Sequence, residues 1–212
     1  MKKLLILLGA IFLIFSVSGL ARADIITFDD VGPGSIGLIP DGYRSLIWHG
    51  IYAGTSLYID GSQVAPGSGY DNGAVSGSYV GFNQLNVIRA QPGETLNFYG
   101  GYLTAAWNQG LNVSIQGYLN NVLVYHDLIT LNPYAPTHFQ QSFTNIDKLA
   151  FVAYGGTNAG LGGSGTQLAM DDLSISRLRG GEPVPEPATL LLLVSGLVGL
   201  VGVGRNRLRK TA

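Results

Sequence analysis

Two pairs of neighbouring aspartates have types and spacings that could bind a metal ion. Asp29 and Asp30 end an apolar run, and Asp171 and Asp172 interrupt another, LAMDDLSIS. Burying an unpaired carboxylate is costly, so each pair needs partners. If the first and last strands of the fold lie side by side, the four acids can gather around Ca²⁺, which takes about six to eight oxygen ligands. The alternative is an exposed bulge, or turn-capping aspartates that accept hydrogen bonds from backbone amides.

Aromatic residues are the second chemical resource, because all eleven tyrosines and both tryptophans fall within residues 24–182. A sugar presents apolar C–H faces that stack on an aromatic ring, while neighbouring polar side chains bind its hydroxyls. Aromatic side chains also pack in the interior of β-sheet proteins, which is the competing interpretation. The candidates for glycan binding lie at or near predicted loops: Tyr43, Trp48, Tyr70, Tyr102, Trp107 and its neighbour Asn108.

Neither histidines nor carboxylates form a pattern typical of an enzyme. His49, His126 and His138 are the three histidines, and their spacing matches no metal-ligand motif. His126 precedes Asp127, but neighbours on a strand point to opposite faces, so we interpret both as ordinary surface or edge residues. Glu94 has no second acid with which to flank a cleft, as a glycosidase requires. We therefore expect no catalytic residues.

The elements that must position these residues follow a period of two. In GLNVSIQGYLNNVLVY, apolar residues alternate with polar ones, as in a strand with one buried face. Asn120 and Asn121 tolerate positive φ and predict a tight hairpin turn. Further strands are predicted at residues 25–28, 46–52, 56–59, 79–82, 95–99, 102–107, 138–143, 149–154 and 167–176. No helical period appears outside the two terminal runs, so the expected fold is all-β, a single jelly-roll or β-sandwich domain over residues 24–179.

Charge and cysteine content exclude further classes of protein. The formal net charge of the chain is −1, but residues 24–182 carry five basic and twelve acidic side chains. This surplus of acid repels nucleic acid, so we expect no nucleic-acid partner. The chain contains no cysteine, and its fold therefore uses no disulfide.

The first 23 residues are typical of a secretory signal peptide. Two lysines precede an apolar run, and Ala21-Arg22-Ala23 forms an A-x-A cleavage site. Signal peptidase would then release a chain that begins at Asp24. The alternative is an N-terminal anchor that is retained.

The last 33 residues contain three consecutive features. Pro185, Glu186 and Pro187 lie in a proline-rich linker, residues 180–187, which is extended because proline lacks a backbone donor and restricts its predecessor. Residues 188–204 carry no charge and are about 26 Å long as a helix, close to the minimum for crossing a bilayer. We expect a single transmembrane helix there. A basic tail follows at residues 205–212 and keeps that end in the cytoplasm, through Arg205, Arg207, Arg209 and Lys210.

This order of features resembles the PEP-CTERM sorting signal of Gram-negative bacteria. The resemblance covers residues 184–212: the Pro-Glu-Pro motif, a short apolar helix and an arginine-rich end. It implies that the precursor is anchored in the inner membrane and that an exosortase, an integral-membrane enzyme, removes the tail. It also implies an association with bacteria that make exopolysaccharide, and a final place at the cell surface or in the extracellular matrix. The alternative is an ordinary single-span anchor.

The central segment has a second, less specific resemblance. FYGGYLTAAWNQGLNVSIQGYLNNVLVY, followed by FTNIDKLAFVAYGG and LAMDDLSIS, is similar to jelly-roll domains of the carbohydrate-binding-module or galactose-binding kind. The expected function is that of an exported, non-enzymatic surface or biofilm-matrix protein that binds exopolysaccharide. Two alternatives stay open: a hydrolase or lyase that acts on envelope polysaccharide, and a purely structural matrix protein.

Overall fold

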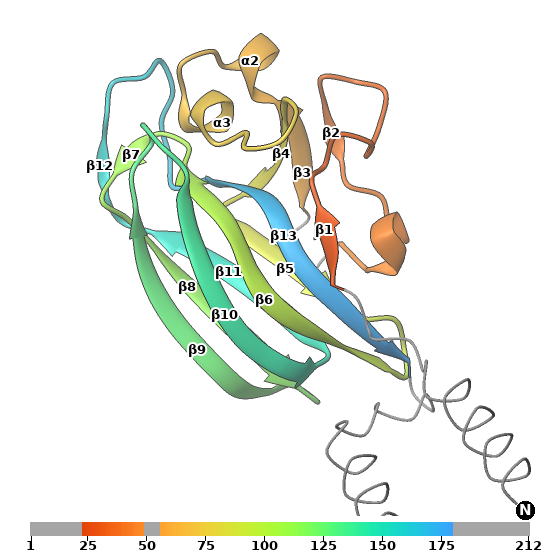
Figure 1. Ribbon diagram of the computed structural model, residues 1–212. Coiled ribbons are helices and arrows are strands. Elements are labelled where there is room, and N and C mark those ends of the chain that lie inside the picture. The colour runs from red at the N-terminus through yellow and green to blue at the C-terminus, as the bar shows by residue number, and fades with distance from the viewer. Residues whose placement is uncertain (1–22, 49–55, 180–212) are drawn as a thin grey trace, which may run out of the picture. The chain divides into compact units, whose positions relative to one another are not determined.

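The computed structural model describes residues 23–48 and 56–179 (Figure 1). These residues form an antiparallel β-sandwich, which confirms the predicted all-β domain. The predicted signal peptide (except Ala23), the proline-rich linker, the transmembrane helix and the basic tail lie outside the described residues, and so does His49. No helix within the described ranges has the length and hydrophobicity needed to cross a membrane.

The larger sheet has seven strands in the order β10-β6-β13-β4-β3-β2, with β1 paired to β13. The first and last strands are therefore neighbours, with Asp24 opposite Ile175. The bounds of its strands are β1 Asp24–Ile26, β2 Ile36–Leu38, β3 Leu57–Asp60, β4 Tyr79–Asn83, β6 Glu94–Ala105, β10 Thr137–Ile146 and β13 Leu168–Arg179.

The second sheet has four strands in the order β5-β11-β8-β9. The predicted hairpin is confirmed as β8 and β9, and its turn residues Asn120 and Asn121 adopt φ values of 52° and 64°. A small ribbon of β7 and β12 lies beside the two main sheets. The remaining bounds are β5 Leu85–Arg89, β7 Asn108–Gln109, β8 Leu111–Leu119, β9 Val122–Leu131, β11 Lys148–Tyr154 and β12 Thr157–Asn158.

The main hydrophobic core fills the space between the two sheets. Alternate residues of β8 are fully buried there, whereas their polar neighbours face outward. Phe98 of β6 packs against three aromatic rings of the interior, those of Phe139, Phe143 and Phe151. The open edges β9 and β10 meet through Tyr125, whose ring stacks on Phe143 with centroids 4.8 Å apart. Side chains rather than backbone hydrogen bonds thus close this side of the sandwich.

A second, smaller hydrophobic cluster lies on the outward face of the seven-stranded sheet. Two short helices between β3 and β4, α2 (Gly61–Val64) and α3 (Gly69–Asn72), accompany it and appear beside β3 and β4 in Figure 1. Gly69 permits the close approach, because a Cβ there would lie 1.7 Å from the Ala105 carbonyl oxygen. The buried members of the cluster are Ile59, Tyr70, Val80, Phe82, Ala106 and Ala169.

Several predicted strand boundaries were wrong. The two strands expected at residues 95–99 and 102–107 are one strand, β6, that continues through Gly100 and Gly101 at positive φ. The strand expected at 46–52 is reduced, within its described part, to a bridge between Ile47 and Arg89. Strands β2 and β5 and both helices were missed, because segments of three to five residues are too short to establish a period.

Candidate functional site

Asp171, one of the predicted metal ligands, is a buried aspartate that caps a loop. Its side chain is completely shielded from solvent, and Oδ2 accepts hydrogen bonds from the backbone N–H groups of Val75 (2.8 Å) and Ser76 (2.9 Å). Burial raises the pKa of Asp171 to about 7, against the lowering effect of those N–H donors. This geometry is the turn-capping alternative that the sequence left open.

Asp172 and Asp29 bind the same loop. Asp172 has a φ of 48° at a register shift of β13, so it lies on a bulge, and its Oδ1 accepts a hydrogen bond from Ser76 Oγ at 2.7 Å. Asp29 Oδ1 accepts from the backbone N–H groups of Ser78 (3.1 Å) and Tyr79 (3.3 Å). Three carboxylates therefore fasten residues 75–79 to the seven-stranded sheet.

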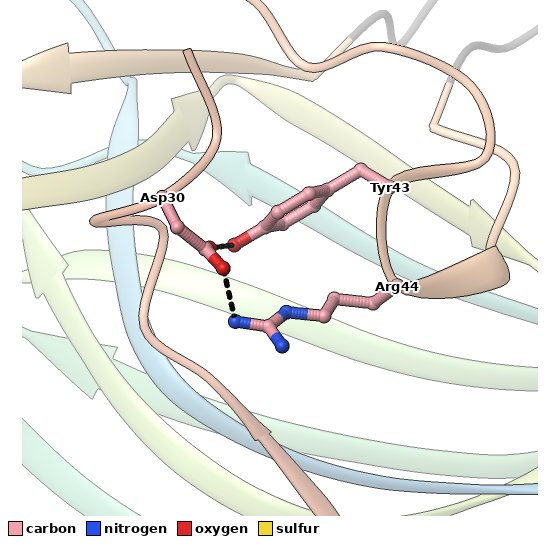
Figure 2. A network of polar contacts seen from close by, with 3 residues as sticks. All are labelled: Asp30, Tyr43 and Arg44. Carbon is pink, nitrogen blue, oxygen red and sulfur yellow. Dashed lines mark hydrogen bonds and ion pairs between the residues drawn. The ribbon is translucent and has the colours of Figure 1, made fainter.

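Asp30 bonds instead to one other segment, at residues 43–44. Figure 2 shows its carboxylate between the Tyr43 hydroxyl and the Arg44 guanidinium, each of which donates a hydrogen bond at 2.7 Å. Tyr43 and Arg44 belong to the 3₁₀ helix η1 (Tyr43–Ser45). The hydrogen bond from Tyr43, together with the charge of Arg44, lowers the pKa of Asp30, while burial raises the pKa of Tyr43 to about 12.

The four aspartates thus have protein partners of their own. Within the described residues, no group of three or more His, Asp or Glu side chains is placed to hold a metal ion. Calcium binding at these acids stays a prediction. Thermal melting with and without a chelator tests it, because an ion held only by the native state raises stability, and an unchanged midpoint would remove the hypothesis.

Three of the six predicted glycan-binding residues, Trp48, Tyr70 and Asn108, are buried rather than exposed. Trp48 is fully buried, and its Nε1 donates a hydrogen bond to the Tyr43 carbonyl at 2.9 Å. Tyr70 is 4% exposed and packs edge-on against Phe82 and Trp107. Asn108 is 8% exposed, and its Nδ2 donates to the Gly155 carbonyl. These side chains contribute to packing because the loops that carry them fold back onto the sheets.

The other three predicted residues are partly exposed but lie on different elements. Tyr43 packs against Trp48 and Phe28, beside Asp30. Tyr102 contacts His138 on the outward face of the seven-stranded sheet, with ring centroids 4.7 Å apart. Trp107 follows β6, and the backbone of Gly163 lies directly against its ring. The sequence-based set therefore forms no single surface.

The outward face of the four-stranded sheet carries polar and aromatic side chains that none of the contacts described above involves. We call it the open face, since no helix of the described chain covers it. It alternates with the core residues of the same strands, and its aligned members come from all four of them. These members are Leu85, Val87, Arg89, Asn112, Ser114, Gln116, Tyr118, His126, Leu128, Thr130, Lys148, Ala150, Val152 and Tyr154. Three of these members, Val87, Ser114 and Ala150, are themselves buried by their neighbours.

A chain of hydrogen bonds runs along β8 on the open face. The Tyr118 hydroxyl donates to Gln116 Oε1 (2.6 Å), and Gln116 Nε2 donates to Ser114 Oγ (2.8 Å). Ser114 Oγ lies 2.9 Å from Nε2 of His126 on the neighbouring strand β9. These contacts orient each polar group before a ligand arrives, which reduces the entropy lost on binding.

Two basic residues lie at one end of the open face. Lys148 of β11 is directly opposite Arg89 of β5, and its ammonium is 3.9 Å from the centroid of the Tyr118 ring, a cation–π contact. The two basic side chains also line a pocket of about 550 Å³ at the end of the sandwich, together with the β8–β9 turn and residues 90–95.

The chemistry available on the open face is recognition rather than an evident reaction. A histidine hydrogen-bonded to a serine can activate that hydroxyl as a nucleophile, but a third group usually orients the imidazole. Asp127, the adjacent acid, instead accepts a hydrogen bond from Gln141 of β10, on the opposite side of β9. The expected separation of His126 and Asp127 onto opposite faces is therefore confirmed.

Sequence reasoning missed the residues of the open face as a set. The polar half of the β8 alternation was visible, but it was interpreted only as evidence for a strand. Arg89 and Lys148 are 59 positions apart, and only the pairing of β5 with β11 brings them together.

Comparison with known proteins identifies one segment of the chain. Residues 183–207 match the family model of the PEP-CTERM protein-sorting motif, as the sequence resemblance predicted. No curated protein is significantly similar in sequence.

Solved structures with similar folds include a family 61 carbohydrate-binding module in complex with β-1,4-galactotriose, at 9% identity and a TM-score of 0.34, covering 66% of this chain and 94% of the module. A DUF4465 family protein from Bacteroides ovatus has 11% identity and a TM-score of 0.40, with coverages of 76% and 96%. The xylan-binding CBM22-1 domain of a Paenibacillus barcinonensis protein has 10% identity and a TM-score of 0.37, with coverages of 76% and 99%.

Proposed function

We propose that this chain, which carries a PEP-CTERM protein-sorting motif at residues 183–207, is an exported surface protein that binds carbohydrate without cleaving it. The β-sandwich is the binding domain, and the open face is its binding surface. Signal peptidase removes the N-terminal peptide. The C-terminal helix then holds the precursor in the inner membrane until an exosortase releases the domain to the cell surface or the exopolysaccharide matrix.

The observation that carries the binding proposal is the hydrogen-bonded chain of side chains on the open face. Hydroxyl, amide and imidazole groups alternate there between donors and acceptors, as the hydroxyls of a sugar require. Tyr154, at 46% exposure, presents an aromatic ring at the far end of β11. Oriented polar groups on the same face as an exposed ring are suited to a sugar, which has a polar edge and an apolar face.

The non-catalytic part of the proposal follows from the charges on the open face. Its aligned members include no carboxylate, whereas glycoside hydrolysis uses a pair of them around the scissile bond. The enzyme alternative depends on the Ser114–His126 pair. A purely structural matrix protein would show neither binding nor turnover.

Retention of the purified full-length chain in gels that contain bacterial exopolysaccharide separates these functions. We expect slower migration in the presence of the glycan, with no new reducing ends and no unsaturated products after prolonged incubation. Product formation that Ser114→Ala abolishes would establish the enzyme instead. Unchanged migration with every glycan, and no products, would establish the structural alternative.

Variants locate the binding surface. Gln116→Ala and Tyr154→Ala, both on the open face, are expected to reduce retention. Tyr99→Ala is the matched control, because Tyr99 is a 37% exposed tyrosine of β6 in the other sheet. Trp107→Ala tests a partly exposed candidate from the sequence analysis. Loss of retention in that variant, with Gln116→Ala and Tyr154→Ala unaffected, would move the binding surface to the β6–β7 turn.

The sorting part of the proposal has its own test. The intact mass of the protein from cells and from medium reports both processing events. We expect a matrix form that begins at Asp24 and lacks the basic tail. Full-length C-termini in a host that possesses the exosortase would contradict processing, while leaving the binding proposal unaffected.

A further inference from the structure

The charges of the open face differ from those of the rest of the domain. Residues 24–182 carry five basic and twelve acidic side chains, a net charge of −7. The aligned members of the open face nevertheless include no acid, and they include two of the five basic residues, Arg89 and Lys148. A cationic site on an otherwise anionic domain attracts an anionic group to one defined place.

Neither basic residue is neutralised by the described parts of the protein. The ion pair found there joins Arg44 to Asp30, on other segments. Lys148 contacts the face of the Tyr118 ring, which leaves its ammonium hydrogens available to a ligand. Arg89 Nε is buried and has no hydrogen-bond partner within residues 23–48 and 56–179. An unsatisfied guanidinium donor beside a pocket is a group that a ligand oxygen would stabilise.

The adjoining pocket gives an anionic group room to enter. Its volume is about 550 Å³, and its lining includes Gln91 and Asn121 in addition to the two basic residues. Asp147 and Glu94 also line it, so the formal charges of the pocket lining balance, and the cationic character belongs to the open face above the pocket. Asp147 Oδ2 accepts a hydrogen bond from the Asn120 N–H at 2.6 Å, and Glu94 also interacts with another group of the protein.

We propose that the open face binds an acidic polysaccharide, with the carboxylate of a uronic acid residue between Arg89 and Lys148. This inference rests on the proposed function and specifies its ligand class. The planar guanidinium of arginine matches a carboxylate in a two-point contact, and the ammonium of lysine adds a second charge. Neighbouring sugars then extend along β8, over Tyr118, Gln116 and Ser114.

The experiment compares one polymer in two charge states. Full-length chain is titrated with polygalacturonate and with the same polymer after methyl esterification, and alginate is the second polyuronate. We expect at least about tenfold tighter binding to the charged polymers, because charge-assisted hydrogen bonds are about twice as strong as neutral ones. Raised salt should reduce that difference, since both basic side chains are only partly buried.

Two variants and a matched control assign the effect to residues. Arg89→Gln and Lys148→Gln should each abolish most of the preference for the charged polymers. Arg177→Gln, which removes the same charge from β13 of the other sheet, should leave it unchanged. Unchanged melting temperatures would show that the variants fold.

The outcomes distinguish this inference from the proposed function. Equal affinity for the esterified and charged polymers, or a preference that survives both Arg89→Gln and Lys148→Gln, would overturn the acidic ligand while carbohydrate binding stands. Retention by neutral glycans alone would overturn it in the same way. No binding to any polymer would overturn both.

Discussion

The two outward faces of the sandwich differ in what lies on them: one is partly covered by short helices, and the other is not covered by any described helix. The face of the seven-stranded sheet is covered where α2 and α3 pack on it, and it contributes to a second hydrophobic cluster. The open face of the four-stranded sheet has no such cover in the described chain, and its polar groups bond to one another instead. Outward alternation alone therefore does not mark a ligand surface, since the covered face shows it too.

The segment that follows α3, residues 75–79, is held by carboxylates that accept its hydrogen bonds. Asp171, Asp172 and Asp29 together accept hydrogen bonds from four of the five residues 75–79. On the open face the charged side chains are basic and have no such partner within residues 23–48 and 56–179. The carboxylates of the seven-stranded sheet therefore stabilise the fold, whereas the basic side chains of the open face are available to bind a ligand.

The largest expected difference between the faces concerns two tyrosines. Tyr70→Ala removes a ring that is 4% exposed and packed against Phe82 and Trp107, so we expect a loss of about 3–5 kcal/mol in the free energy of unfolding. Tyr154→Ala, on the open face, should change it by less than about 0.5 kcal/mol. Urea denaturation measures the free energy of unfolding of both variants. Equal losses would contradict the difference between the covered face and the open face.

The second-largest loss of stability is expected at the buried carboxylate of Asp171. Asp171→Ala leaves the N–H groups of Val75 and Ser76 without their acceptor, which should cost about 1–3 kcal/mol. Asp171→Asn retains one side-chain oxygen and should cost less. The same denaturation measurement ranks the two variants, and the reverse order would show that the hydrogen bonds are unimportant.

A pH series sharpens this result. Because burial raises the pKa of Asp171 to about 7, the native state binds a proton that the unfolded state has released between about pH 4 and pH 7. The free energy of unfolding should therefore fall as pH rises through that window, by up to about 1.4 kcal/mol per pH unit from this group. Asp171→Asn lacks this contribution. Identical pH profiles for wild type and variant would contradict the raised pKa.

The smallest effect is expected at the exposed aspartate. Asp30 and Arg44 form an ion pair with side chains that are 60% and 37% exposed. Exposed pairs contribute about 0–1 kcal/mol, and salt screens them, so Arg44→Gln should alter the unfolding midpoint only slightly. Comparison at low and high salt checks this. A loss as large as that of Asp171→Ala would show that exposure does not determine the difference between the acids.

The sequence predicted the parts of the fold that local patterns encode. Alternation in β8 and the turn at Asn120 predicted the hairpin, and the density of turn residues predicted the all-β class. Gly100 and Gly101 were interpreted as an interruption of β6, but they allow it to continue. A Cβ at Gly100 would lie 2.2 Å from the Phe139 carbonyl oxygen, a contact with another strand that no local pattern reveals.

The candidate site was harder to predict, because it depends on pairing between distant segments. The aromatic residues were sound candidates by type, yet Trp48 and Tyr70 became core residues once the loops folded back. Whether the Asp171 carboxylate binds a metal ion or accepts hydrogen bonds from a loop depends on where residues 75–76 lie. Strand order and loop position are global properties, and the period of a single strand does not contain them.

Radical footprinting with bound glycan tests the central claim most directly, that the open face is the carbohydrate-binding surface. The full-length chain is oxidised with and without the exopolysaccharide that retains it, and the protection of each aromatic and histidine side chain is read by mass spectrometry. We predict protection of Tyr118, His126 and Tyr154, with Tyr99 and Tyr134 unchanged. Protection confined to Trp107, or to residues of the seven-stranded sheet, would contradict the account.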